Sequence, residues 1–143
     1  MKSISMVRTL DAPIEAVWRA WVDPSEFGTW FWPERFNTVA SVSAETGGLW
    51  RVSSKPMSMA ASGIYLQVER LRLLRFTWRW DNETTESVVT VTFGPGETTS
   101  DGGVSTTLTV EHEGYLTDEV GDELEQGWND CLDRLPGWLK ANA

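Results

Sequence analysis

Two side chains carry most of the reactive chemistry in this sequence, its one histidine, His112, and its one cysteine, Cys131. Nucleophilic catalysis needs an activated nucleophile, a nearby base and an orienting group. His112 is the base on offer, with Cys131 or a serine of unknown position as its partner. Cys131 lies one turn beyond Trp128 on an apolar helical face, where a lone cysteine is usually a small buried hydrophobe. We therefore predict no catalytic residue and keep Cys131 as a ligand-contact candidate.

His112 has two readings that the sequence leaves open. It alternates with Leu108 and Val110, so it points inward from its strand, where an imidazole could exchange a hydrogen bond with a ligand oxygen. Alternatively, a backbone carbonyl at the strand-to-helix corner satisfies the ring, and its role is structural.

Metal and cofactor chemistry find no support in the sequence. One cysteine beside one histidine makes no zinc-ligand cluster. The acid pairs at 118–119 and 122–123 lie on the polar face of a predicted helix, where they solvate that face. We expect neither a metal site nor a cofactor.

The nine tryptophans are the most informative residues of the chain, because a chain of 143 residues normally carries far fewer. Phe76, Trp78 and Trp80 share one face of a predicted strand and should look toward Trp128. Rigid indoles pack with gaps, and each N–H needs a partner, so an aromatic interior predicts a cavity. The candidate ligand contacts are Trp30, Trp32, Trp50, Tyr65, Trp78, Trp80, Phe93, His112, Trp128 and Cys131. For Tyr65 the side of the strand stays open, because Ile64 and Leu66 form a competing apolar face.

The apolar pattern predicts the elements that hold these residues. Alternation at 4–10 predicts a strand, and Pro13 begins a helix that ends before a second short helix through Trp30. Further strands are predicted at 39–42, 49–52, 63–68, 73–80, 88–93 and 104–112, with a polar hairpin tip at 98–103.

A long amphipathic helix closes the chain. Apolar residues recur at spacings of three and four from Leu116 to Leu135. We expect Gly127 to let a strand approach closely, and Pro136 to kink the helix or to start a separate turn.

The net charge of −9 and the pI near 4.5 disfavour nucleic acid and anionic membrane surfaces as partners. The first residues show no apolar run of signal-peptide or membrane-span length, so we expect a cytoplasmic protein. The sequence leaves open whether it is a monomer or a homodimer.

Several short motifs together resemble the bacterial branch of the family named for the activator of Hsp90 ATPase, in the SRPBCC, START or Bet v 1-like superfamily. They are Ala12-Pro13 with Val17-Trp18, Trp30 near Pro33, Gly47-Gly48, Gly63-x-Tyr65, Phe76-Thr77-Trp78, Val89-x-Val91-x-Phe93, Thr107-Leu108 with His112, and Gly127-Trp128-x-x-x-Leu132. The resemblance implies an α+β helix-grip domain over residues 1–143. It further implies a seven-stranded curved antiparallel sheet around a long C-terminal helix, two short helices after strand one, and a cavity between sheet and helix.

The chain also departs from the family pattern. It reads Ser43-Ala44-Glu45-Thr46 before the paired glycines, and Gln67 stands where a carboxylate is usual. The separate N-terminal domain of the eukaryotic namesakes has no counterpart, which argues against Hsp90 activation.

Three functional hypotheses follow. The first is binding of a small apolar molecule, of aromatic, lipid or polyketide-like chemistry. The second is a cyclase or hydrolase-like enzyme that uses His112. The third is an Hsp90-type chaperone-linked interaction module.

Overall fold

The computed structural model describes residues 2–98, 102–115 and 117–142. Along the chain the elements are β1 Lys2–Leu10, α1 Ile14–Val22, α2 Pro24–Trp30, the short 3-10 helix η1 Glu34–Phe36, β2 Val39–Val42, β3 Leu49–Ser54, β4 Met59–Glu69, β5 Leu73–Trp80, β6 Ser87–Pro95, β7 Thr106–Tyr115 and α3 Asp118–Ala141.

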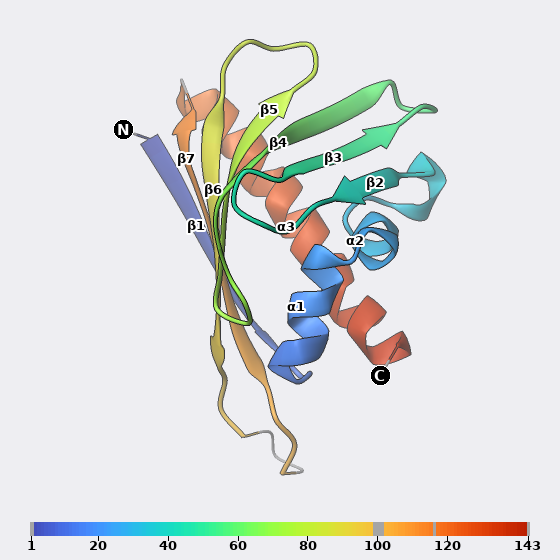
Figure 1. Cartoon of the computed structure of the whole chain (residues 1–143), viewed down its shortest axis with the longest axis vertical. Coiled ribbons are helices and arrows are strands. Elements are labelled where there is room, and N and C mark those ends of the chain that lie inside the picture. Colours follow the sequence, from blue (N-terminus) through green and yellow to red (C-terminus); the bar gives the residue numbers. More distant parts are fainter. Residues whose placement is uncertain (1, 99–101, 116, 143) are drawn as a thin grey trace.

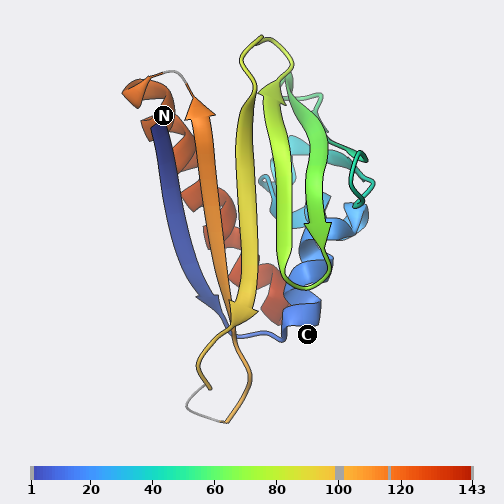
Figure 2. The same cartoon turned by 60° about the vertical axis from the view of Figure 1, so that its left-hand side comes forward.

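The strands form one seven-stranded sheet in the order β1-β7-β6-β5-β4-β3-β2, and every neighbouring pair is antiparallel. The β2–β4 end of the sheet curls around the helices (Figure 1). All three α-helices lie on one face, with α3 running behind β1 and β7 (Figure 2). The predicted helix-grip fold is confirmed.

Helix α3 has a capped N-terminus. The Thr117 side chain accepts from the Val120 N–H, and acids in the first turn suit the positive end of the helix dipole. The helix buries Trp128, Leu132 and Leu135 against the sheet. It continues through Pro136 to Ala141, without a separate final turn.

Two expectations about α3 need correction. A Cβ on Gly127 would meet nothing within 4 Å, so no strand approaches there. The close approach is instead at Gly121, where a Cβ would lie 2.6 Å from the Tyr115 ring. Val120, expected on the buried stripe, is 37% exposed. Leu116 and part of the 98–103 hairpin tip lie outside the described residues.

The side of β4 that faces the core is settled by burial. Tyr65 is 4% exposed, whereas Ile64 and Leu66 are exposed. A bulge between Tyr65 and Gln67 breaks the register of β4 on β5. At Gly63 the backbone lies so close to β5 that a Cβ would overlap the Thr77 carbonyl. Glycine is therefore required where the two strands meet.

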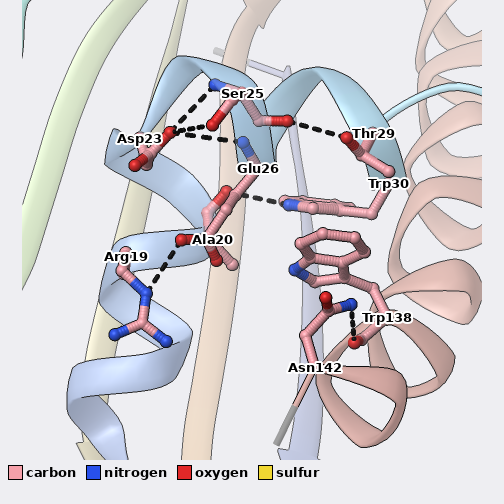
Figure 3. A network of polar contacts seen from close by, with 9 residues as sticks. All are labelled: Arg19, Ala20, Asp23, Ser25, Glu26, Thr29, Trp30, Trp138 and Asn142. Atoms are coloured by element: carbon pink, nitrogen blue, oxygen red, sulfur yellow. Dashed lines mark hydrogen bonds and ion pairs between the residues drawn. The ribbon is translucent and has the colours of Figure 1, made fainter.

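Helices α1 and α2 join at Asp23, whose side chain accepts from the Ser25 and Glu26 backbone N–H groups and caps α2. In Figure 3 the Trp30 indole at the end of α2 donates to the Ala20 carbonyl of α1, at 2.8 Å. Arg134 of α3 donates to the Trp30 carbonyl, and Trp138 of α3 is drawn below the Trp30 ring in the same view. Trp30 thus ties the two short helices to each other, next to the end of α3.

Candidate functional site

Two adjoining clefts run between α3 and the sheet. The first, of about 440 Å³, lies between the N-terminal half of α3 and the ends of β4 to β7. The second, of about 320 Å³, lies between the middle of α3 and residues 31–36. Both are lined by Met59, Trp78, Trp80, Glu123 and Leu124. The clefts therefore form one trough, open to solvent, whose volumes lie in the range of small-molecule sites.

The aromatic wall of the trough comes from alternation on β5. Trp78 and Trp80 are two residues apart, so both side chains project from the helix-covered face. Trp80 is half-buried at the strand end and stacks on Trp32, with ring centroids 6.3 Å apart and planes 3° apart. Trp78 is only 5% exposed and packs on Trp128 and Phe31 at centroid distances of 5.7 and 6.1 Å.

A chain of hydrogen bonds fixes the deep side of the trough. The Trp128 indole N–H donates to His112 Nδ1 at 2.9 Å, and His112 Nε2 lies 2.6 Å from Ser87 Oγ. An indole nitrogen can only donate, so Nδ1 accepts and the neutral ring carries its proton on Nε2. His112 therefore donates to Ser87 Oγ. The Ser87 hydroxyl in turn donates to the Trp78 carbonyl, 3.4 Å away.

This direction of donation bears on catalysis. In a serine nucleophile pair, histidine Nε2 accepts the serine proton. Here Nε2 already holds a proton, so His112 cannot act as the base for Ser87 in this arrangement. Burial also lowers the pKa of His112 to about 4, which keeps the ring neutral near pH 7.

Cys131 lines the second cleft but is 5% exposed. Burial raises the pKa of its thiol to about 12, so the thiolate is scarce at neutral pH. Its polar neighbour is Arg134 Nη2, at 3.6 Å, whereas His112 is engaged by Trp128 and Ser87. The two reactive side chains do not form a pair.

Arg134 joins α3 to the segment that forms the second cleft. Its Nε donates to the Trp30 carbonyl at 3.1 Å and its Nη2 to the Phe31 carbonyl at 2.6 Å. These carbonyls end α2, where a helix has unpaired acceptors and a partial negative charge. The guanidinium satisfies both and holds residues 31–36 against α3.

Five of the ten predicted ligand contacts line the trough: Trp32, Trp78, Trp80, Trp128 and Cys131. The other five, Trp30, Trp50, Tyr65, Phe93 and His112, line neither cleft and are buried in the core.

Each of these five has packing or polar partners elsewhere. The Trp50 indole donates to the Thr77 carbonyl at 3.0 Å, and Tyr65 packs on Phe76. Phe93 meets the rings of α1. Burial raises the pKa of the Tyr65 hydroxyl.

Several lining residues were not predicted as ligand contacts from the sequence: Leu124, Arg134, Ser87 and Tyr115. Leu124 stands on the predicted apolar stripe of α3, so its spacing was a usable signal. Nothing in the spacing of Arg134 shows that it reaches the end of α2, since that contact depends on how two distant helices cross.

The described part of the chain holds no group of three or more metal-ligating side chains. Within the same residues, no helix is long and apolar enough to cross a membrane.

The family model described as activator of Hsp90 ATPase homolog 1-like protein matches residues 11–140. The chain belongs to this family. A comparison with curated proteins finds no match.

Solved structures share the fold. A protein from Chromobacterium violaceum is 26% identical over 96% of each chain, with a TM-score of 0.77. DynU16, a putative protein of the dynemicin biosynthetic locus, is 26% identical over 99% of this chain and 48% of its own, with a TM-score of 0.80. An Hsp90 activator from Plasmodium falciparum is 18% identical over 90% of this chain and 88% of its own, with a TM-score of 0.68.

Proposed function

We propose that this member of the family binds a small, mainly apolar molecule with an aromatic or acyl body in the trough between α3 and the sheet. The observation that carries the proposal is the pair of adjoining clefts, of about 440 and 320 Å³, walled by Trp32, Trp78, Trp80 and Trp128. The mainly apolar lining of the second cleft is typical of ligand sites.

Binding fits the polar contacts of the site better than catalysis does. Both ring nitrogens of His112 are engaged, and the proton on Nε2 points at Ser87. A ligand that enters the trough meets the indoles before it meets His112, because His112 is fully buried and lines neither cleft. We do not propose an Hsp90-linked role, because the likeness to the Plasmodium activator, at 18% identity, shows the fold alone.

A neutral fluorescent probe tests the proposal. N-phenyl-1-naphthylamine brightens in apolar surroundings, and we expect it to bind the protein saturably with one site. Leu124 is half-buried and lines both clefts, so Leu124→Trp should fill the trough and weaken probe binding about tenfold or more.

The matched control is Glu125→Trp, which adds the same side chain at an exposed position of α3 that lines neither cleft. This variant should bind like the wild type. Equal binding by Leu124→Trp, with both variants folded, would place the probe elsewhere and remove the proposal.

A further inference from the structure

The trough has two ends of different charge. The first cleft is lined by Asp81, Glu83 and Glu123 and by no basic side chain. The second cleft is lined by two arginines, Arg35 and Arg134. A ligand that lies along the trough therefore meets an acidic end and an end that offers guanidinium groups.

Within the described residues the two arginines have no ion pair, a property that they share with Arg70 and Arg79, which line neither cleft. Five other arginines lie within 4.0 Å of a carboxylate: Arg8, Arg19, Arg51, Arg72 and Arg75. Across the described residues, neither Arg35 nor Arg134 has a carboxylate at that distance.

Arg134 keeps hydrogen-bonding capacity for a ligand. Its Nε and Nη2 are occupied by the carbonyls that end α2 and by Cys131 Sγ. Its Nη1, which carries two N–H groups, has no partner within the described part of the chain. The bonds to α2 hold the guanidinium in place, so little conformational freedom is lost when an oxygen binds to Nη1. Arg35 is exposed and stacks over the Phe36 ring at 5.3 Å, on the same wall.

The Trp78 ring lines the same space, but its indole nitrogen is buried. Trp78 is 5% exposed, and its indole nitrogen has no acceptor among the described residues. The indoles of Trp30, Trp50 and Trp128 each have one, whereas those of Trp21 and Trp138, which line neither cleft, have none among the described residues. This unpaired N–H is therefore not specific to the trough, and the apolar body of a ligand packs on the face of the Trp78 ring.

The carboxylates of the second cleft sit on its outer side. Glu123 and Asp130 are both exposed, and Asp130 accepts from Gln126 at 3.0 Å. They weaken the field of the arginines without pairing with them.

We propose that the ligand is an apolar carboxylic acid, with its carboxylate at Arg134 and Arg35 and its apolar body along Trp80 and Trp78 toward the first cleft. Charge-assisted hydrogen bonds to arginine are strong and geometrically specific. Arg51 pairs with Asp81, so the repulsion that favours this orientation comes from Glu83, which lines the first cleft alone, and from Glu123, which both clefts share. The inference rests on the proposed ligand binding and adds its chemical class.

Matched probes separate this inference from the proposed function. 2-Naphthoic acid and 2-naphthamide have the same ring and nearly the same shape, and differ by one charge. By calorimetry at pH 7.5 we expect the acid to bind about tenfold or more tightly than the amide, and to lose affinity in high salt.

Variants locate the carboxylate. Arg134→Gln should weaken the acid about tenfold while the amide changes less than about twofold. Arg35→Gln, at an exposed site that leaves α2 intact, should act in the same direction. It serves as the test if Arg134→Gln fails to fold. Glu123→Gln should strengthen acid binding. Arg70→Gln, an exposed site that lines neither cleft, makes the same charge change and should have no effect.

The outcomes are distinguishable. If the neutral naphthylamine probe binds but acid and amide bind alike, or Arg35→Gln and Arg134→Gln leave their ratio unchanged, the carboxylic-acid inference is overturned and ligand binding stands. If none of the three probes binds, both fall.

Discussion

Replacing Trp128 by alanine should be the most destabilising single change on α3. Trp128 is 3% exposed and packs on Trp21, Phe31 and Trp78 at ring-centroid distances of 6.1, 5.7 and 5.7 Å. Truncating a buried tryptophan typically costs about 3–5 kcal/mol. The same change removes the only donor to His112 Nδ1 among the described residues, and an orphaned buried acceptor costs about 1–3 kcal/mol.

The two contributions are not additive, because the second cleft can admit water where the ring stood. We expect a total loss of about 4–6 kcal/mol for Trp128→Ala, a large part of the stability of an ordinary domain. Trp128→Phe keeps an aromatic ring but not the N–H, and should lose about 1–3 kcal/mol. The difference between the two variants separates packing from the hydrogen bond.

Urea denaturation followed by circular dichroism at pH 7.5 measures both losses. A cost below about 2 kcal/mol for Trp128→Ala, together with no cost for Trp128→Phe, would show that Trp128 is a peripheral cleft residue and that the hydrogen-bond chain through His112 contributes little.

Three further predictions concern neighbouring groups. His112 has its pKa lowered to about 4, so the unfolded chain takes up its proton first as the pH falls. The contribution of His112 should therefore remove about 3 kcal/mol of stability between pH 7 and pH 4, so the unfolding free energy of His112→Asn should fall less with acid than that of the wild type. Parallel pH profiles for variant and wild type would contradict this. Cys131, with its pKa raised to about 12, should resist iodoacetamide at pH 8 in the native protein and react fully in urea, as mass spectrometry can show. Gly127→Ala should raise the unfolding free energy by about 0.5–1 kcal/mol, because its Cβ meets open space. Gly121→Ala should lower the unfolding free energy, because the Tyr115 ring lies 2.6 Å from the new carbon. The opposite order in urea melts would refute the placement of the helix.

The sequence predicted the parts of the fold that depend on local pattern. Alternation along β5 placed Trp78 and Trp80 on one face, and the three-and-four spacing of α3 placed Trp128 and Leu132 inside. These inferences need only the periodicities of strand and helix, so they do not depend on how distant segments pack.

Residues whose roles depend on long-range contacts could not be predicted in this way. His112 was placed inward, as it is, but its partners are Trp128, 16 positions along the chain, and Ser87, 25 positions away. Trp30 was predicted as a ligand contact, yet its indole donates to the Ala20 carbonyl because α2 folds back on α1. The ligand-contact assignments, the single domain over 1–143, the oligomeric state and the cytoplasmic location stay predictions.

The indole N–H signals of the tryptophans offer the most direct test of ligand binding in the trough. Each gives its own peak in a ¹H–¹⁵N spectrum, and the nine indoles divide into those that line the trough and those that do not. On titration with N-phenyl-1-naphthylamine, the lining indoles should shift, namely Trp32, Trp78, Trp80 and Trp128. The indoles away from the trough should stay in place, namely Trp18, Trp21, Trp30, Trp50 and Trp138. Shifts confined to this second group, or no saturable shift at all, would contradict the account.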